Sequence, residues 1–224
     1  MSKVSVIIPT LNENHGIVDV LEKIPYDGFE EMGYDVEVLV VDGGSTDGTR
    51  ERAGKMGADV YLHEGGKASA VRRGLKESDG DYVFLIDGDG SYPPSVMVRM
   101  VEKLENGATM VIGSRFLGEI QDGSMSKLNK FGNRVLTRMA NKWYPEEVSD
   151  LCTGLRGFKR GALNGSVPGV GFQIEAGLHT VFAGKGVAEV PIKYAKRKGE
   201  SKLRTVDGLK IARLLWKKRK GKGV

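Results

Sequence analysis

The sequence predicts an α/β fold, in which a mostly parallel central sheet carries helices on both faces and an amphipathic helix follows at the C-terminal end. Short apolar runs alternate with stretches of helical periodicity from residue 4 to residue 113, and this alternation is typical of right-handed β-α-β crossovers. The runs are continuously apolar, as expected for strands that are covered on both faces. At 224 residues, the chain is long enough for one large domain, with or without an appendage.

The first part of the chain is expected to alternate strands with helices. Strands are predicted at residues 4–8, 36–41, 58–62, 83–86 and 109–112, and helices from about 12–14 to 24 and at 47–56, 65–75 and 96–104. Ile17, Val18, Leu21 and Ile24 repeat at helical spacing in the first helix. Ser45 or Thr46 can cap the second helix, and Pro93-Pro94 suits the start of the last.

The alternation weakens after residue 113. A helix is predicted at residues 128–143, a short strand at 155–159, a helix at 173–183 and a strand at 186–194. A basic loop at 195–203 precedes a last helix at 206–220. We therefore divide the chain into a main domain, residues 1–203, and a basic amphipathic tail, residues 204–224.

Charge is distributed unevenly along the chain. Residues 193–224 contain 13 Lys and Arg against two acids, a net charge of +11, so the other 192 residues sum to −6 within the total of +5. A basic tail on a mildly acidic body favours an anionic partner, either a membrane surface or nucleic acid. The single cysteine, Cys152, excludes an intrachain disulfide and suits a reducing compartment. Nothing resembles a signal peptide, and no apolar run approaches the ~20 residues that span a bilayer.

Two carboxylates one residue apart follow the predicted strand at 83–86. Asp87 and Asp89 are interleaved with Gly88 and Gly90, and ligands of open α/β sheets bind just past the carboxyl ends of the strands. Carboxylate oxygens there can hold Mg²⁺ or Mn²⁺, whose remaining positions go to water and phosphate oxygens. The alternative is a solvated Asp-Gly turn after a core strand.

Polar residues also follow the first two strands. Asn12-Glu13 and Asp42 should therefore meet Asp87 at one edge of a parallel sheet, where Asp42 can accept hydrogen bonds from a base or ribose. The absence of both G-x-G-x-x-G after the first strand and G-x-x-x-x-G-K-[ST] disfavours dinucleotide and P-loop sites. Gly65-Gly66-Lys67 is weakly specific, because a helix-start turn with a solvated lysine has the same composition.

Several short motifs occur in an order that resembles one enzyme family. They are Val6-Ile-Ile-Pro-Thr-Leu-Asn-Glu, Val40-Val-Asp-Gly-Gly-Ser-Thr-Asp-Gly-Thr, Gly66-Lys, Asp87-Gly-Asp and Gly113-Ser-Arg. This set resembles the family 2 inverting glycosyltransferases, which have the Rossmann-like GT-A fold. Ser149-Asp-Leu-Cys-Thr-Gly-Leu-Arg-Gly-Phe, Glu189-Val-Pro-Ile and Tyr194-Ala-Lys-Arg-Lys-Gly-Glu-Ser-Lys are similar to the branch that makes polyprenyl-phosphate sugars, the dolichyl-phosphate mannose and glucose synthases. The resemblance runs from about residue 4 to residue 210.

This resemblance implies a function and a set of site residues. Residues 1–203 would be a catalytic domain that transfers a hexosyl unit from a UDP- or GDP-sugar to dolichyl or polyprenyl phosphate, for glycan assembly. The donor nucleotide is expected near Pro9, Leu11, Glu13, Asp42, Gly66, Lys67, Asp87, Gly88 and Lys202. Mg²⁺ or Mn²⁺ is expected on Asp87 and Asp89, with Ser91 as a variable third ligand. The catalytic set is expected to be Asp89, Arg115, Asp150 and Arg197, and the acceptor phosphate is expected near Lys130, Arg134 and Ser201.

Two positions depart from the family pattern. Leu11 stands where an aromatic residue is common, and Gly43 replaces a frequent second aspartate. Both positions bear on the nucleotide base, so they concern the identity of the donor rather than the chemistry.

The chemistry of the implied reaction agrees with the residues present. The charge on a leaving diphosphate has to be stabilised by a metal ion and by cationic side chains. Arg197 and Lys202 would supply the cationic side chains. A phosphate monoester is already an anion at neutral pH, so it needs no strong general base. The three histidines fall in no site motif and are interpreted as surface or packing residues; they are His15, His63 and His179.

Two basic amphipathic helices have more than one interpretation. The helix at 128–143 either has an ordinary solvated basic face or contacts the acceptor phosphate. In the last helix Leu209, Ile211, Ala212, Leu215 and Trp216 are placed on one side, with Lys210, Arg213 and Lys217 opposite. Such a helix is typical of a membrane-surface element, although its apolar side could instead pack on its own domain or on a second subunit. We expect a cytoplasmic protein, peripheral on the membrane and held there directly, by a membrane-anchored partner subunit or as a homo-oligomer.

Two competing functions can be set against this one. A family 2 transferase acting on a hydroxyl of a glycan, protein or small molecule would require a general base, and Asp150 would have to serve. Asp150 could also simply cap a helix. Nucleic-acid binding is disfavoured, because the tail has few aromatic residues for stacking and the acidic cluster would have no role.

Overall fold

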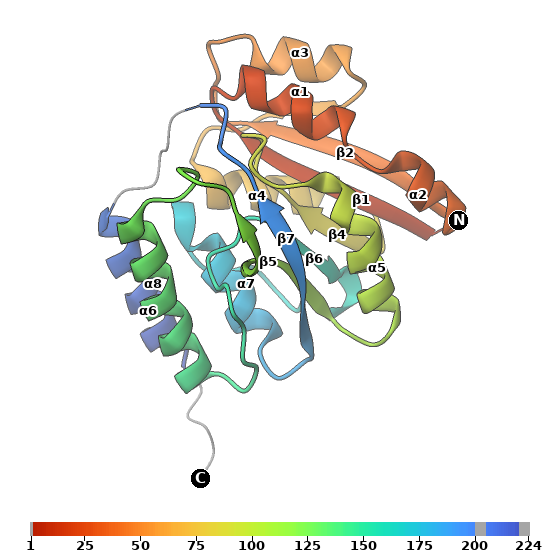
Figure 1. The fold of residues 1–224 in the computed structure, drawn as a ribbon. Coiled ribbons are helices and arrows are strands. Elements are labelled where there is room, and N and C mark those ends of the chain that lie inside the picture. Colours follow the sequence, from red (N-terminus) through yellow and green to blue (C-terminus); the bar gives the residue numbers. More distant parts are fainter. Residues whose placement is uncertain (1, 200–204, 220–224) are drawn as a thin grey trace.

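In the computed structural model, which describes residues 2–199 and 205–219, seven strands form one sheet in the order β3-β2-β1-β4-β6-β5-β7 (Figure 1). The strands are β1 (Ser2–Thr10), β2 (Tyr34–Asp42), β3 (Asp59–Leu62), β4 (Tyr82–Leu85), β5 (Met110–Ile120), β6 (Arg156–Lys159) and β7 (Val187–Tyr194). β6 is antiparallel to both of its neighbours, and every other pair in this sheet is parallel. The predicted mostly parallel α/β sheet is therefore confirmed.

Helices cover both faces of the sheet. One face carries α1 (Asn14–Glu22), α2 (Tyr26–Glu31), α3 (Thr49–Lys55) and α5 (Met97–Glu105), and the other carries α4 (Lys67–Glu77) and α7 (Ile174–Phe182). Consecutive residues of β1 enter different cores, because Val6 and Ile8 pack under the first group while Ile7 packs under the second. Each such side chain, fully buried, contributes about 1.5–3 kcal/mol. This two-sided burial explains why the strands are continuously apolar.

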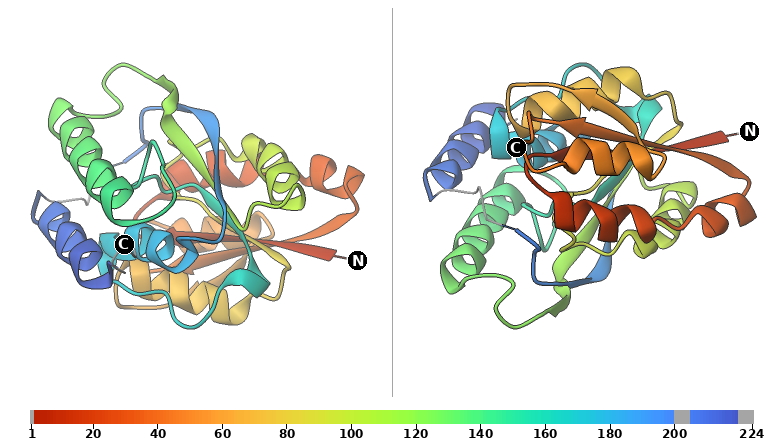
Figure 2. Two further views of the ribbon diagram at one scale, coloured as in Figure 1. Left: turned by 90° about the horizontal axis from the view of Figure 1, so that it is seen from below. Right: turned by 90° about the horizontal axis from the view of Figure 1, so that it is seen from above.

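A third apolar cluster joins α6 (Lys127–Trp143), α7 and α8 (Thr205–Lys218), and α6 and α8 lie side by side on one flank of the sheet (Figures 1 and 2). Ile211 and Leu215 of α8 are buried in this cluster, whereas Leu209 and Trp216 are 74% and 52% exposed. The expectation of a single apolar side on this helix is therefore wrong: part of it packs on the domain and part faces outward. No helix of the described residues is long and apolar enough to cross a bilayer.

Several local predictions are also corrected. α2 was not expected, because its six residues are too few to show a periodicity. Neither Ser45 nor Thr46 caps α3, which begins after Gly48 in a left-handed conformation; the Ser45 hydroxyl donates to Asp42 instead. β5 continues to Ile120, well past the predicted end at 112, and it does so by pairing with β7 across an irregularity after Ser114.

Candidate active site

The carboxyl ends of β1, β2 and β4 lie at one edge of the sheet, as expected for parallel neighbours. Thr10 is paired with Asp42 in the sheet, and its hydroxyl donates to the Asp42 carboxylate at 3.1 Å. Gly88, which follows β4, lies against Thr10, because a Cβ at Gly88 would approach the Thr10 Cγ2 to 2.8 Å. Residues at the carboxyl ends of three separate strands are thus in contact.

Two further glycines fix the acidic pair that follows β4. A Cβ at Gly16 of α1 would lie 2.5 Å from the carbonyl oxygen of Gly88, so α1 can rest directly on this backbone only because Gly16 has no side chain. A Cβ at Gly154 would lie 2.4 Å from Oδ2 of Asp87. Gly154 therefore allows the chain that precedes β6 to close over the Asp87 carboxylate.

Each carboxylate of the pair contacts a cation. Lys67 Nζ lies 2.6 Å from Asp87 Oδ1, and Arg197 Nη2 lies 2.8 Å from Asp89 Oδ2. The other oxygen of Asp89 accepts hydrogen bonds from the backbone N–H of Ser91, at 2.9 Å, and from its hydroxyl, at 2.5 Å. Ser91 therefore adjoins Asp89, where the resemblance puts a third ligand.

Lys67 lies between two acids. Its ammonium also contacts Glu175 Oε1 of α7 at 2.5 Å and lies 5.7 Å from the centre of the Phe172 ring. Burial alone would lower the pKa of Lys67, but the Asp87 and Glu175 carboxylates hold it above its ordinary value. Glu175 was not identified from sequence; the available clue was a single acid among the apolar residues at the start of the predicted 173–183 helix.

The residues present fit a divalent cation that keeps solvent and phosphate ligands. In the part of the chain that the structure describes, no group of three or more Asp, Glu, His or Cys could enclose a metal ion. Asp87, Asp89 and Ser91 nevertheless offer adjacent hard oxygen donors, which suits Mg²⁺ or Mn²⁺ bound through one or two carboxylates and a diphosphate. Asp87 and Asp89 would hold such an ion, and it would offset charge on a leaving diphosphate.

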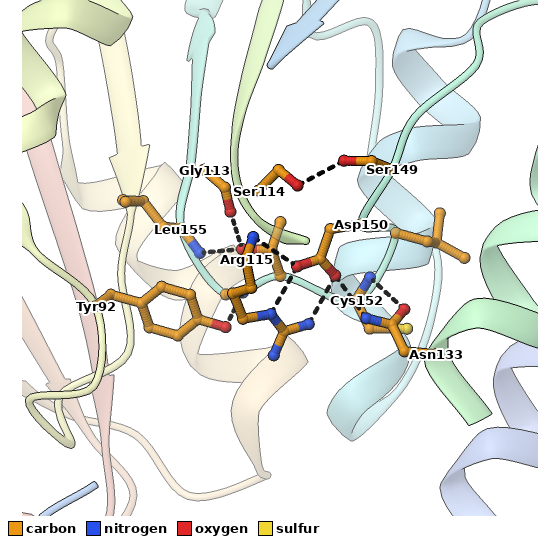
Figure 3. Close-up of polar contacts among 12 residues, drawn as sticks. Tyr92, Gly113, Ser114, Arg115, Asn133, Ser149, Asp150, Cys152 and Leu155 are labelled. Carbon is orange, nitrogen blue, oxygen red and sulfur yellow. Dashed lines mark hydrogen bonds and ion pairs between the residues drawn. The ribbon is translucent and has the colours of Figure 1, made fainter. Parts of the chain in front are cut away.

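A second polar centre lies where β5 meets the loop before β6. The Arg115 guanidinium contacts the Asp150 carboxylate twice, at 2.6 Å from Nε to Oδ2 and 2.7 Å from Nη2 to Oδ1 (Figure 3). Asp150 also accepts from the backbone N–H of Arg115 at 3.1 Å and from Nδ2 of Asn133 at 2.6 Å. Asp150 thus binds Arg115 and Asn133, and it does not cap a helix, which excludes that alternative interpretation.

The environment keeps Asp150 ionised. Its side chain is fully buried, and burial by itself raises the pKa of a carboxyl, but the hydrogen bonds from Arg115 and Asn133 hold the pKa of Asp150 below its ordinary value. The rings of Tyr194 and Tyr92 lie 5.2 Å and 6.0 Å from the Arg115 guanidinium carbon. The cation is therefore held between a carboxylate and aromatic faces.

The residues that precede this pair are also joined. The hydroxyls of Ser114 and Ser149 are 2.5 Å apart, and Ser149 donates from its backbone N–H and its hydroxyl to Glu189 of β7. Burial raises the pKa of the Glu189 carboxyl. Ser149, Glu189 and Asn133 were not identified from sequence as site residues, because neighbours on other strands and helices cannot be read from local spacing.

Asp42 is oriented toward its own loop. One carboxylate oxygen accepts from the backbone N–H groups of Gly44 and Ser45, and the other accepts from the hydroxyls of Ser45 and Thr10. Asp42 is fully buried, whereas the neighbouring Leu11 is 40% exposed. A role for Asp42 toward a base or ribose stays a prediction; its observed contacts shape the turn that follows β2.

The remaining predicted donor residues surround the same edge. Pro9 lines a small enclosed cavity together with Lys67 and Asp87. Gly66 precedes α4 with a φ of 79°, a conformation that favours glycine. Glu13 is buried beneath the basic loop, because a Cβ at Gly199 would lie 3.1 Å from Glu13 Oε2.

The basic loop after β7 is attached to the acidic pair. The backbone N–H of Ala195 donates to the carbonyl of Ser91, and that of Lys198 donates to the carbonyl of Asp89, both at 2.9 Å. The Lys198 ammonium pairs with Asp19 of α1 at 2.6 Å. The predicted contacts Ser201 and Lys202 lie outside the described residues.

The predicted acceptor residues lie on α6. Arg134 is exposed and its guanidinium lies 5.5 Å from the centre of the Phe116 ring, while Lys130 is half-buried. Asn133, between them in sequence, is buried and bonded to Asp150. α6 thus reaches the Arg115–Asp150 pair from its inner side, and contact of Lys130 or Arg134 with a phosphate stays a prediction.

The histidines lie outside these contacts. His15 is exposed, and His63 bonds the Ser69 hydroxyl at 2.6 Å. His179 is fully buried, with its ring 5.5 Å from that of Tyr144. His179 is therefore a packing residue, in agreement with the sequence interpretation.

Comparison with known proteins adds a family and several relatives. Residues 5–165 match the domain described as "Glycosyl transferase family 2". The chain is 32% identical over 217 residues to the dolichol-phosphate mannosyltransferase of Pyrococcus furiosus, covering 90% of this chain and 59% of the relative. It is 33% identical over 204 residues to the dolichyl-phosphate hexose transferase of Haloferax volcanii, covering 89% of this chain and 86% of the relative. It is 36% identical over 199 residues to glycosyltransferase AglJ of the same organism, covering 87% of this chain and 63% of the relative.

The matches cover different shares of the known proteins. The chain spans only 52–63% of the length of three of its curated relatives. Among solved structures, glucosyl-3-phosphoglycerate synthase from Mycobacterium tuberculosis, in complex with phosphoglyceric acid, superposes with a TM-score of 0.74 over 97% of this chain and 80% of that one. At 24% identity, this likeness shows a shared fold.

Proposed function

The chain belongs to glycosyl transferase family 2 and has the GT-A fold, and from that premise we propose that it transfers a hexosyl unit from a nucleoside diphosphate sugar to a polyprenyl phosphate. Relatives named dolichol-phosphate mannosyltransferase, dolichyl-phosphate hexose transferase and undecaprenyl-phosphate mannosyltransferase are 31–33% identical to it. In this proposal residues 1–203 form the catalytic domain and residues 204–224 a basic tail.

The choice of acceptor rests on the hydrogen bonds that Asp150 already accepts from Arg115 and Asn133. A general base works best with a pKa near the operating pH and a free lone pair aimed at the proton that it removes. Asp150 is fully buried, its pKa is lowered, and both of its oxygens already accept from Arg115 or Asn133. This arrangement supports an acceptor that arrives as an anion, such as a phosphate monoester, over a hydroxyl that must lose a proton.

The residues of the chain then have separate tasks. An acceptor phosphate oxygen forms a bond to the anomeric carbon on the face opposite the diphosphate, and the bond to the diphosphate breaks. Arg197 and Lys202 would hold the departing charge, and Arg115, kept in place by Asp150, would orient the sugar or the acceptor. No proton transfer is needed in this step.

A divalent cation, Mg²⁺ or Mn²⁺, is part of the proposal. Asp87 and Asp89 would bind it, with Ser91 nearby, and it would stabilise the charge of the leaving nucleoside diphosphate. A structural neighbour, glucosyl-3-phosphoglycerate synthase, has been solved with Mn²⁺ and UDP. The identity of the nucleotide is left to experiment, since Leu11 and Gly43 depart from the family pattern.

We also propose that the protein lies at the cytoplasmic face of a membrane. Polyprenyl phosphates reside in bilayers, so the enzyme has to reach the headgroup plane. Leu209 and Trp216 of α8 are exposed, as are Leu128 and Phe131 of the adjacent α6, and both helices carry Lys and Arg. Exposed apolar side chains among cations suit an anionic membrane surface.

The experiment is a transfer assay with purified protein, Mn²⁺ and a short polyprenyl phosphate. UDP-glucose, UDP-N-acetylglucosamine and GDP-mannose serve as radiolabelled donors, and lipid-linked product is counted after extraction. Asp87→Ala and Asp89→Ala should each abolish transfer, whereas Asp122→Ala, an exposed carboxylate of the 121–126 turn, should not. Full turnover in EDTA, or transfer only to hydroxyl acceptors, would overturn the proposal.

A further inference from the structure

A row of charged side chains extends from the partly exposed Asp87 into the protein. Asp87 contacts Lys67 at 2.6 Å, and Lys67 contacts Glu175 at 2.5 Å. Arg156 is fully buried, and its Nε and Nη2 donate to backbone carbonyls. One small enclosed cavity is lined by all four of these side chains.

Glu175 lies in a place where packing alone would favour an apolar side chain. It is only 7% exposed, and the residues around it on α7, Ile174, Ala176 and Leu178, are buried in apolar clusters. A buried carboxylate is costly unless a charged or hydrogen-bonding partner offsets the loss of water. The partner here is Lys67. Because Lys67 also contacts Asp87, it links the Glu175 carboxylate to the proposed metal-binding acid.

The charges of this row decide what Asp87 presents to a cation. With Lys67 alone beside it, the negative charge of Asp87 would be largely cancelled, and a divalent cation would be repelled by the ammonium. Glu175 offsets the charge of Lys67, and Arg156 lines the same cavity. The carboxylate of Asp87 thereby keeps its charge for a ligand on the side toward Asp89.

The contacts also fix geometry. The Lys67 ammonium has three N–H donors, and two of them are directed to carboxylates on different elements, with the Phe172 ring at 5.7 Å. On the other side of Asp87, Gly154 lets the backbone approach so closely that an added Cβ would lie 2.4 Å from Oδ2. Asp87 is thus held between Lys67 and Gly154, and Glu175 holds Lys67.

We propose that Glu175 is a positioning residue for the divalent cation: by offsetting the charge of Lys67, it sets the negative charge that Asp87 offers to a cation. This inference rests on the proposed function, because it assumes that Asp87 binds a metal ion. It extends that function to α7, an element that contributes no residue to the predicted donor, metal or acceptor sets.

The test measures metal binding directly. Free Mn²⁺ is followed by electron paramagnetic resonance during titration of the full chain, with Mn²⁺ alone and with Mn²⁺ plus UDP or GDP. Removing one negative charge close to a divalent cation should raise the Kd for Mn²⁺ of Glu175→Gln about tenfold. Glu37→Gln, which alters another partly buried acid that contacts Ser5 and Lys3 and not Lys67, is the matched control and should bind Mn²⁺ nearly as the wild type does.

A double-mutant cycle separates charge balance from a merely structural role. Lys67→Met removes the opposing cation, so it should bind Mn²⁺ at least as tightly as the wild type. The double variant Glu175→Gln/Lys67→Met should recover most of the affinity that Glu175→Gln loses. A structural role predicts the reverse, with losses that accumulate in the double variant.

Each outcome bears on the inference. Equal affinity of Glu175→Gln and wild type, or no recovery in the double variant, would overturn it while leaving the proposed function intact. If the wild type binds no Mn²⁺ with either nucleotide, the metal-dependent function fails and the inference fails with it. Should Glu175→Gln not fold, as judged by circular dichroism, Lys67→Met still tests the sign of the effect, because weaker binding by that variant contradicts the charge argument.

Discussion

The Arg115 guanidinium meets the Asp150 carboxylate edge to edge, with two contacts of 2.6 Å and 2.7 Å between side chains that are both buried. A bidentate pair of this kind fixes the plane of both groups. Asn133 adds a third contact from α6, so strand β5, helix α6 and the loop before β6 are joined through one carboxylate. Loss of that charge would leave Arg115 buried without its partner.

Asp150→Asn should therefore lower the free energy of unfolding by about 3 kcal/mol at pH 7, within the range for breaking a buried ion pair. The pKa of Asp150 is lower in the folded chain than in the unfolded one, so its stabilisation is present above the unfolded pKa and is lost as pH falls through the folded pKa. Urea unfolding at several pH values between 7 and 3 measures both effects.

The control for this prediction is Asp122→Asn, which removes an exposed carboxylate. The stability difference between wild type and Asp150→Asn should shrink toward acid pH, while the control stays close to wild type. A difference that is constant across the pH range would mean that Asp150 is not held ionised by Arg115.

A second pH dependence comes from His179. Burial, and after it the nearby Arg156 guanidinium, lowers the pKa of His179 to about 4, and among the described residues neither ring nitrogen has a hydrogen-bond partner. A histidine in an unfolded chain has a pKa of about 6.5. Between pH 4 and pH 6.5 the unfolded chain therefore binds more protons than the folded chain, and the free energy of unfolding falls as pH falls. The full effect is on the order of 3 kcal/mol, at about 1.4 kcal/mol per pH unit.

His179→Phe should remove this dependence, because Phe fills a similar volume and takes up no proton. Urea unfolding from pH 7 to pH 4.5 should show a shallower loss of stability for the variant than for the wild type. His15→Phe, at an exposed position, is the control. Identical slopes for wild type and His179→Phe would show that the buried ring is not the source of the pH dependence.

Much of the fold follows from the sequence because parallel strands covered on both faces are continuous apolar runs. Val4–Ile8 within β1 and the strand at 83–86 could be read in this way, and the site acids follow from their place after these strands. β6 is different: only its neighbours β4 and β5 decide that it runs antiparallel, and no local pattern of four residues contains that information.

The site was predictable only where motifs carry it. Asp87, Asp89, Arg115 and Asp150 stand in recognisable short motifs, and the structure brings them to the same edge of the sheet. Asn133 and Glu175 do not, and the motif that contains Glu189 does not show its partner, since each of the three contacts a residue far away in sequence: Asp150, Lys67 and Ser149. Such pairings are set by tertiary packing, which spacing along one chain does not describe.

Arg197 should be needed for turnover. Its guanidinium contacts Asp89 at 2.8 Å, and the loop around it is tied to Ser91 and Asp89 through the backbone. We expect Arg197 to contact a bound diphosphate, so Arg197→Ala should reduce kcat by about 100-fold, in line with the loss of one charged contact to the transition state. Lys193→Ala, a more exposed cation that pairs with Glu119, should retain activity.

Limited proteolysis checks the expected contact between Arg197 and the diphosphate. Cleavage within residues 196–202 should slow when UDP or GDP is present together with Mn²⁺, and the protection should be weaker in Arg197→Ala. Equal cleavage rates with and without nucleotide and metal would contradict this contact.

Membrane binding is predicted to depend on the outward side of α8. Removing the whole helix is a poor test, because Ile211 and Leu215 pack in the cluster shared with α6 and α7 and their loss would damage the fold. The double variant Leu209→Ser/Trp216→Ser instead alters two exposed residues. Burying such side chains in the interface contributes about 1–2 kcal/mol, so the variant should bind anionic vesicles about tenfold more weakly.

Co-sedimentation with vesicles containing anionic lipid measures this binding. Because exposed charges are screened over about 8 Å at physiological salt, binding of the wild type should also fall as salt rises and should be weaker on purely zwitterionic vesicles. Leu62→Ser/Tyr26→Ser, which changes two exposed apolar residues on β3 and α2, is the matched control. If both double variants sediment with vesicles as the wild type does, Leu209 and Trp216 do not contact lipid, and another part of the protein or a partner must bring the site to the membrane.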